Sequence, residues 1–260
     1  MTTLVAYAKD GAVARLTLDS PHNRNALSTA LVAQLHEHLA TAAADPDVRC
    51  VVLGHTGGTF CAGADLSEAA GPGDPVVNRA REMTELLRTI VASPLPVIGA
   101  VDGHVRAGGL GLIGACDIVV AGPSTTFALT EARIGVAPSI ISLTLLPKMS
   151  ARAAGRYFVT GEKFGPAEAA SVGLITVAAD NVDATVAKFT TEIVKGSPQG
   201  LAASKALTTA SLLAGFDAAA ESLTVQSATL FASEEARDGM MAFLEKRPPR
   251  WLAGTADGAV

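Results

Sequence analysis

The stretch Gly103–Asp117, Gly-His-Val-Arg-Ala-Gly-Gly-Leu-Gly-Leu-Ile-Gly-Ala-Cys-Asp, decides the fold of this chain. It lies between an apolar run that ends at Val101 and another that begins at Ile118, so it predicts a strand, a glycine-rich turn, a short buried helix and a second strand. A turn that opens a helix leaves N–H groups unpaired, and such groups suit an oxygen that develops negative charge. We therefore expect this stretch to form one half of a site.

A second glycine-rich loop, Thr56–Leu66, is the candidate for the other half. It follows a continuous apolar strand at Arg49–His55, and a helix at Val76–Val91 and a strand at Val97–Val101 come next. Strands that alternate with helices favour a largely parallel sheet. Ligands of such sheets bind at the carboxyl ends of the strands, so we expect the two loops to face one cleft.

The first part of the chain predicts a hairpin, a helix and a candidate lid. Asp10-Gly11 between two apolar runs is typical of a tight turn between antiparallel strands. Ser28 can cap a helix that continues to about Ala43. The segment Ala69–Pro75, with two glycines and two prolines, predicts a surface loop that can act as a lid.

Helices dominate the end of the chain. A break at Gly196-Ser197-Pro198 divides an expected α/β core over residues 1–195 from a helical region over residues 196–260. The pattern after Val182 predicts four helices, at Ala184–Lys195, Gly200–Leu213, Ala218–Phe231 and Glu234–Glu245.

Composition excludes several classes of protein. Hydrophobic residues make up 49% of the 260 residues and charged residues 17%, which argues against disorder. The net charge of −5, without a basic stripe, argues against nucleic acid as a partner. Three widely spaced cysteines in apolar surroundings predict buried free thiols in a reducing cytoplasm. We expect neither a signal peptide nor a membrane span, since no charged-then-apolar leader opens the chain and charged residues interrupt its apolar segments.

Several motifs in order and spacing resemble the crotonase (enoyl-CoA hydratase/isomerase) superfamily. These are Asn25-Ala26-Leu27, Phe60–Leu66, Gly103–Asp117, Thr160-Gly161-Glu162 and Phe243–Arg247, so the resemblance covers nearly the whole chain. It implies an α/β fold with a spiral ββα core, acyl-CoA thioester substrates of fatty acid metabolism, and a homotrimer or dimer of trimers held partly by the C-terminal helices. Coenzyme A is then part of the substrate, so no separate cofactor is expected.

The resemblance also assigns roles to individual residues. It places an oxyanion hole in the backbone N–H groups of Ala64 and Gly108, which would bind the thioester oxygen as it becomes negative. Preorganised donors of this kind are worth roughly 3–4 kcal/mol each in the transition state. For Arg24 and Lys246 a role as solvated surface charges is an equal alternative. The implied coenzyme A contacts are Arg24, Ala26, Ala62, Asp65, Leu66 and, at the adenine end, Lys246.

The chain departs from the family pattern at one of two usual glutamates. The first falls at Gly111, which has no side chain, whereas the second is retained as Glu131. Two carboxylates let one activate water while the other protonates the α-carbon. One carboxylate suffices for a 3,2-enoyl-CoA isomerase, which moves a proton between the α and γ carbons, and it also leaves hydration open.

A local similarity favours hydration. The Gly111-Leu112 substitution and the run Pro138–Ser142 resemble bacterial methylglutaconyl-CoA-type hydratases. We therefore expect a lyase that stabilises an enolate-like intermediate and hydrates a 2-enoyl-CoA, with branched or glutaconyl-type thioesters as candidate substrates. The isomerase and a catalytically silent acyl-CoA binder stay open as alternatives.

Other reactive side chains have simpler interpretations. Arg106 can bind a substrate carboxylate, but a salt bridge to Asp102 or to a neighbouring subunit is favoured. A hydrogen-bonded structural role is favoured for His104 over acid/base chemistry. Cys61 has no histidine tied to it by a motif, so we expect no thiol nucleophile. The histidine pair His36/His38 points to different helix faces, so we expect no metal site.

Overall fold

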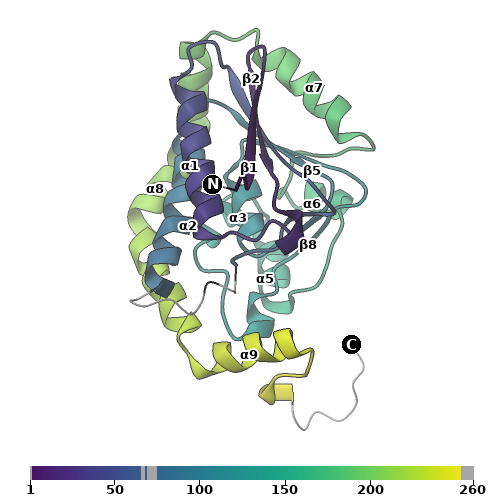
Figure 1. Cartoon of the computed structure of the whole chain (residues 1–260), viewed down its shortest axis with the longest axis vertical. Helices are drawn as coiled ribbons and strands as arrows, with labels where there is room; N and C mark the ends of the chain where they lie inside the picture. The colour runs from purple at the N-terminus through teal and green to yellow at the C-terminus, as the bar shows by residue number, and fades with distance from the viewer. Residues whose placement is uncertain (1, 66–67, 69–74, 253–260) are drawn as a thin grey trace.

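The computed structural model describes residues 2–65, 68 and 75–252, and these contain two β-sheets flanked by helices (Figure 1). The larger sheet has six strands in the order β1-β2-β3-β5-β7-β9. Only β1 and β2 are antiparallel, around Gly11 at φ 56°, and the other neighbouring pairs are parallel. The expected hairpin and the largely parallel sheet are therefore confirmed. The strands are β1 (Val5–Asp10), β2 (Val13–Leu18), β3 (Cys50–His55), β5 (Val97–Val101), β7 (Ile118–Ala121) and β9 (Val177–Ala178).

A second, smaller sheet consists of three strands of three residues each, in the order β4-β6-β8. These are β4 (Thr59–Cys61), β6 (His104–Arg106) and β8 (Thr126–Ala128), all parallel. The sequence patterns did not predict them, because three residues are too few to show a strand period. All three strands bury apolar side chains, which are Phe60 and Cys61 in β4, Val105 in β6, and Phe127 and Ala128 in β8.

Consecutive strands alternate between the two sheets. The first strand of each pair lies in the large sheet and the second in the small sheet, for the pairs β3–β4, β5–β6 and β7–β8. A helical segment follows each pair. This threefold repeat is the ββα spiral that the resemblance implied. The helical segments are α1 (Thr29–Ala44), α2 (Pro75–Ala92), α3 (Gly108–Ala115), α4 (Ser142–Leu145), α5 (Ala151–Thr160), α6 (Pro166–Ser171), α7 (Val182–Ile193), α8 (Pro198–Phe231), α9 (Glu234–Glu245), and the 3-10 helices η1 (Pro21–Asn23), η3 (Glu131–Ile134) and η4 (Arg250–Leu252).

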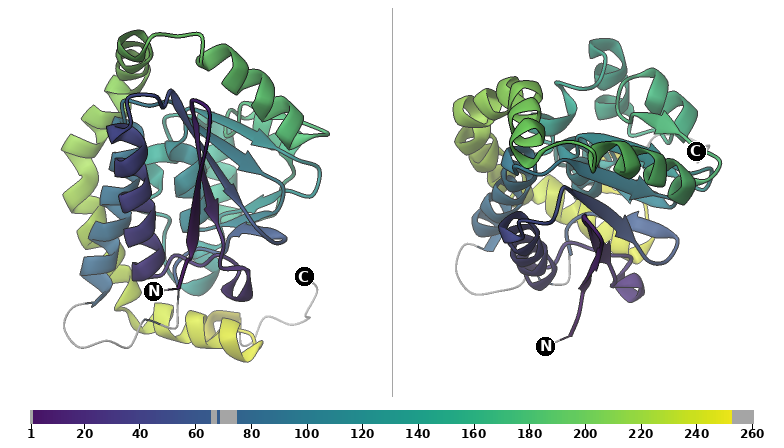
Figure 2. Two further views of the ribbon diagram at one scale, coloured as in Figure 1. Left: turned by 45° about the horizontal axis from the view of Figure 1, so that its top comes forward. Right: turned by 90° about the horizontal axis from the view of Figure 1, so that it is seen from above.

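The two faces of the six-stranded sheet pack against different helices. Val52 and Ile98 join a small cluster with Val186 of α7. Val51 and Leu53, which point the opposite way, belong to the main core together with side chains of α1 and α2. Both views in Figure 2 show α1, α2 and α8 packed side by side at one flank of this core.

The C-terminal region differs from the expectation in one respect. The two predicted helices at Gly200–Leu213 and Ala218–Phe231 form a single helix, α8, of 34 residues. Gly215 lies between them, and one helical glycine costs only about 1 kcal/mol, which packing of α8 along α2 offsets. Among the described helices, none combines the length and apolarity needed to cross a membrane. The proposed lid lies mostly outside the described residues, at positions 69–74.

One buried ion pair holds α8 to the core. Lys205 Nζ lies 2.8 Å from Asp117 Oδ2, and the two side chains are 3% and 17% exposed. The ammonium also donates to the carbonyl oxygens of Ile90 and Leu95, at 2.9 and 3.0 Å. Asp117 in turn accepts a hydrogen bond from the Val97 N–H at 2.7 Å. The pair thus joins α8, the end of α2 and the starts of β5 and β7.

Replacing Lys205 with alanine should destabilise the protein by about 3–5 kcal/mol, because it leaves the Asp117 carboxylate buried without its cation. Denaturant unfolding would measure the loss. Lys195→Ala is the matched control, since Lys195 pairs with Glu192 at 2.7 Å but both side chains are more than 60% exposed. That variant should change the free energy of unfolding by less than about 1 kcal/mol. Equal effects in the two variants would contradict the structural role of Lys205.

Candidate active site

The small sheet brings three loops to one edge of the molecule. Ala64 follows β4 by three residues, Gly108 follows β6 by two and Glu131 follows β8 by three. The three strands are parallel, with one irregularity in the pairing of β4 with β6 between Thr59 and Cys61, so their carboxyl ends lie side by side. The sheet therefore gathers both glycine-rich loops and the retained glutamate.

The two glycine-rich loops touch each other at Gly63. A Cβ on Gly63 would lie 2.8 Å from the Ala107 Cβ and 3.7 Å from the Gly108 nitrogen. Gly63 has φ 99°, which an L-residue rarely adopts, so both its conformation and its contacts require glycine. Ala107 has φ 45° and ψ −121°, and this sharp turn starts α3 at Gly108. The contact fixes the position of one loop relative to the other.

The amides at these two positions are free to bind an oxygen. Leu27 pairs with Ala64 in an isolated parallel β-bridge. The Leu27 N–H donates to the Gly63 carbonyl at 2.8 Å, and the Leu27 carbonyl accepts from the Asp65 N–H at 3.2 Å. This pairing leaves the Ala64 N–H unused, and the Gly108 N–H belongs to the first turn of α3. Within the described residues neither N–H has a hydrogen-bond acceptor. Two unpaired donors on contacting loops form a ready site for a negative oxygen.

Apolar side chains fill the space next to the Gly111 Cα. A Cβ at this position would lie 2.6 Å from Ile141 Cγ2 and 3.1 Å from Met83 Cε. Thr144 Oγ1 donates to the Gly111 carbonyl at 3.2 Å, so α4 packs closely on α3 here. The place expected for a first glutamate is therefore occupied by apolar atoms.

Glu131 is a buried carboxyl with one unpaired oxygen. Its residue is 7% exposed, and Oε2 has no hydrogen-bond partner among the described residues. Burial raises its pKa from the ordinary 4.5 to about 7. A carboxyl with this pKa is present in both protonation states near neutral pH, so it can accept a proton and return one.

The backbone around Glu131 is held by tight packing against α9. A Cβ on Gly135 would lie 2.7 Å from the carbonyl carbon of Glu235, and a Cβ on Gly239 would lie 2.6 Å from that of Ile134. The two glycines therefore let the backbone of α9 contact η3 directly. Figure 1 shows α9 across the end of the molecule, below α5.

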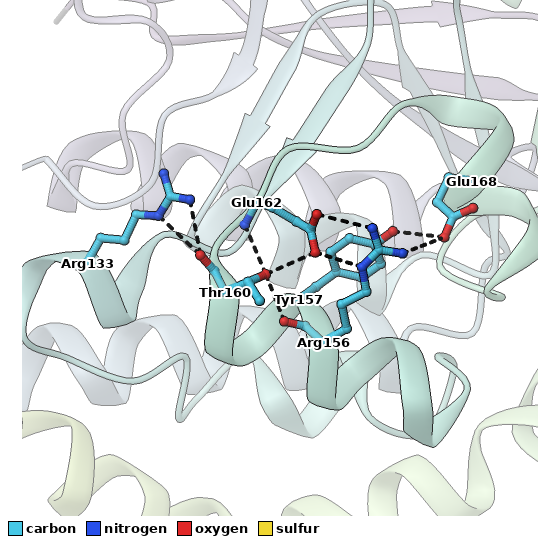
Figure 3. A network of polar contacts seen from close by, with 6 residues as sticks. All are labelled: Arg133, Arg156, Tyr157, Thr160, Glu162 and Glu168. Atoms are coloured by element: carbon cyan, nitrogen blue, oxygen red, sulfur yellow. Dashed lines mark hydrogen bonds and ion pairs between the residues drawn. The ribbon is translucent and has the colours of Figure 1, made fainter. Parts of the chain in front are cut away.

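A polar network fixes η3 from the other side (Figure 3). Arg133 donates to the Thr160 carbonyl from Nε and Nη2, at 3.2 and 3.1 Å. Glu162 accepts from Arg156 at 2.7 and 3.1 Å and from the Thr160 hydroxyl at 3.2 Å. Tyr157 donates to Glu168 at 2.8 Å. The Thr160-Gly161-Glu162 motif thus has a structural role that the sequence patterns did not indicate.

Four of the predicted coenzyme A contacts lie together at the second glycine-rich loop, and these are Arg24, Ala26, Ala62 and Asp65. The Ala62 N–H donates to the Arg24 carbonyl at 3.1 Å, which brings the segments of Ala26 and Asp65 side by side. Leu66 lies outside the described residues. Lys246 is the C-terminal cap of α9.

Asn25 organises this segment, and sequence reasoning missed its role. Asn25 is fully buried at φ 53°. Its Nδ2 donates to the carbonyls of Thr56 and Thr59 at 3.1 and 2.8 Å, and its Oδ1 accepts from the Ser20 N–H at 2.7 Å. One amide side chain thus ties the segment to the start of the second glycine-rich loop. Its position inside a family motif was the only signal.

The expected salt bridge from Arg106 to Asp102 is wrong, whereas one to a neighbouring subunit stays a prediction. Arg106 reaches across to β8 and donates to the carbonyl and hydroxyl of Thr126, at 2.6 and 2.8 Å. Asp102 instead accepts from the Ser124 N–H at 3.0 Å. His104 Nδ1 lies 2.9 Å from the same Thr126 hydroxyl, which agrees with its structural interpretation.

The cysteines and acidic residues offer no other reactive centre. All three cysteines are free and buried, as expected. Burial raises the pKa of the Cys61 thiol to about 12, so it stays protonated and unreactive near neutral pH. Across residues 2–65, 68 and 75–252, histidine, cysteine and carboxylate side chains form no cluster that could hold a metal ion.

Comparisons with known proteins identify the family of the chain. Residues 8–254 match the profile of the family Enoyl-CoA hydratase/isomerase. A "Probable enoyl-CoA hydratase" of Rhodobacter capsulatus is 35% identical over 259 residues, which cover 95% of this chain and 97% of the relative. A "Mevalonyl-coenzyme A hydratase" of Aspergillus fumigatus is 30% identical, with 91% and 90% covered. The crystal structure of an enoyl-CoA hydratase from Mycobacterium avium superposes with a TM-score of 0.91 at 65% identity, with 96% and 100% covered. The chain therefore belongs to the enoyl-CoA hydratase/isomerase family and has the α/β fold of the crotonases.

Proposed function

We propose that this enzyme hydrates 2-enoyl-CoA thioesters with Glu131 as its single acid/base residue. The observation that carries the proposal is the buried Glu131 carboxyl, with its unpaired Oε2, at the same sheet edge as two unpaired amides. Relatives named as enoyl-CoA hydratases support the reaction class.

The two amides would stabilise the charge that hydration creates. When a nucleophile adds to C3 of a 2-enoyl thioester, the electrons of the C2–C3 double bond move onto the thioester oxygen. The N–H groups of Ala64 and Gly108 would donate to that oxygen and bind the enolate more strongly than the substrate carbonyl. Both donors sit on loops fixed by the Gly63 contact, so they need no reorganisation during the reaction.

Glu131 would carry the one proton that is transferred, first from the water and then to C2. As a carboxylate it accepts one proton from water, while the water oxygen forms its bond to C3. As the resulting acid it donates a proton to C2 of the enolate, which completes the addition of water and restores the carboxylate. A pKa of about 7 suits both half-steps, because neither protonation state is strongly disfavoured near neutral pH.

Substrate and coenzyme A binding are part of the same proposal. The segment of Arg24 and Ala26, together with Ala62, Asp65 and Leu66, would bind the coenzyme A moiety, with Lys246 at the adenine end. The similarity of the Pro138–Ser142 run to methylglutaconyl-CoA-type hydratases supports branched or glutaconyl-type acyl groups.

The isomerase is the second candidate function, because hydrocarbon from Ile141 and Met83 takes the place of a second carboxylate. An isomerase would need only Glu131, for a proton that leaves the γ carbon and one that joins the α carbon. A 3-enoyl-CoA substrate separates the two functions: an isomerase converts it to the conjugated 2-enoyl product, whereas a hydratase leaves it unchanged. Binding of either thioester without turnover would identify a silent binder.

We also propose that residues 196–260 assemble the chain into a homotrimer or a dimer of trimers. Large apolar side chains stay exposed in this region of the isolated chain, and Phe243 and Leu244 of α9 are 61% and 59% exposed. Exposed apolar groups this close together are typical of an interaction surface.

The pH dependence of kcat/KM should report the ionisation of Glu131. Hydration needs the carboxylate form as base, so kcat/KM should rise with pH through an apparent pKa of about 7. Glu131→Gln should lower kcat at least ~100-fold on a panel of 2-enoyl-CoA thioesters. The control Glu37→Gln, on an exposed position of α1, should keep the wild-type rate. Undiminished activity of Glu131→Gln would contradict the assignment.

Restoring a glutamate at position 111 should not restore a two-carboxylate site. Gly111→Ala and Gly111→Glu should both lower the melting temperature, because the new Cβ overlaps Ile141 Cγ2. Gly215→Ala in α8 is the control, since nothing lies within 4 Å of its new Cβ, and it should raise stability by up to about 1 kcal/mol. A Gly111→Glu protein with unchanged stability and faster hydration would contradict the claim that Ile141 leaves no room for a side chain at position 111.

Light scattering should give a mass of three or six times 26.3 kDa for the purified protein. The double variant Phe243→Glu/Leu244→Glu should shift the mass downwards, because it places charges on the proposed contact surface. Val194→Glu, at an exposed apolar position outside residues 196–260, should leave the mass unchanged. A wild-type monomer would exclude this assembly.

A further inference from the structure

Two buried side-chain oxygens are left without a hydrogen-bond partner in the described part of the chain. They are Glu131 Oε2 and Ser139 Oγ, in residues that are 7% and 6% exposed. Buried polar atoms are normally satisfied, so each unsatisfied one calls for an explanation. Here both lie within one nine-residue segment, and the mechanism above uses only the first.

The segment between them is folded back on itself by its own backbone. The Val136 N–H donates to the Glu131 carbonyl at 3.1 Å, and the Ser139 N–H donates to the Ala137 carbonyl at 2.8 Å. Three residues on, the Ser142 hydroxyl donates to the Ser139 carbonyl at 2.5 Å. The turn therefore holds its shape without the Ser139 hydroxyl, which has no structural bond to make.

The same turn carries the side chain that closes Gly111. Ile141, two residues after Ser139, lies against Gly111 in the first turn of α3, and α3 begins with the Gly108 amide. Thr144 fastens the turn to α3 through its bond to the Gly111 carbonyl. Ser139 thus belongs to the piece of chain that takes the place of the first glutamate, and it follows Glu131 by eight residues.

We infer that Ser139 Oγ holds the attacking water for Glu131, so that a carboxylate and a hydroxyl together do what two carboxylates do in other hydratases. This inference rests on the proposed hydration. A water between the two atoms donates one hydrogen to Glu131 and the other to Ser139, which leaves a lone pair for C3. Such a water satisfies both orphan oxygens, and a buried water needs two or more polar partners.

The serine is a positioning residue and exchanges no proton. In the balanced step, one water proton passes to Glu131, the water oxygen bonds to C3, and the proton on Glu131 passes to C2. Ser139 keeps its own hydrogen throughout. It orients the water, and it has no function in a reaction that involves no water.

Two reactions of the full-length protein separate this role from a general structural one. Hydration of 2-butenoyl-CoA needs the positioned water, whereas exchange of the α-protons of butyryl-CoA in D2O needs only Glu131 and the amide site. Ser139→Ala should lower kcat for hydration roughly 10- to 100-fold with little change in KM, and should leave the exchange rate within about threefold of wild type. Glu131→Gln should abolish both reactions.

Ser142→Ala is the matched control, because that hydroxyl is already bonded within the turn. It should retain both reactions at nearly the wild-type ratio. Ser139→Ala should melt at or above the wild-type temperature, since it removes an unsatisfied buried hydroxyl. A folded Ser139→Ala protein that hydrates at the wild-type rate, or that loses hydration and exchange equally, overturns the inference while leaving hydration itself established. A wild-type protein without hydratase activity overturns the proposed function, and the inference fails with it.

Discussion

The parallel hydrogen bonding of three very short strands is the constraint on which the site depends. β4, β6 and β8 each have only three residues, yet their register sets where three loops start. A shift of one residue in β6 would move the Gly108 amide by about 3 Å and turn its neighbours to the opposite face. The large sheet and its helices give these strands their fixed positions, because each short strand continues from a strand of the large sheet.

Close backbone contact is the second recurring feature. Gly63, Gly109 and Gly111 all sit where a Cβ would lie less than 3 Å from another residue. Glycine at these positions lets one loop press on the next and excludes water from the space between them. Exclusion of water also explains why the pKa of Glu131 is raised, since the cause of that shift is burial.

Sequence patterns predicted the elements that are long enough to show a period. The hairpin, α1 with its Ser28 cap and the parallel strands β3, β5 and β7 follow from apolar runs and capping residues. The three short strands have no such period, and α8 is continuous because tertiary packing outweighs a single glycine. The partner of Arg106 and the closure of Gly111 by Ile141 depend on residues from distant elements, which no local pattern encodes.

The contact between α9 and η3 links the acidity of the site to the end of the chain. Gly239 lies about a hundred residues after Glu131, yet it allows α9 to cover the helix on which that carboxyl sits. Any substitution on α9 that admits water to η3 lowers the pKa of Glu131 towards 4.5. A carboxylate with that lower pKa is a weaker base. Evolution can therefore tune the strength of this base through residues that never approach the substrate.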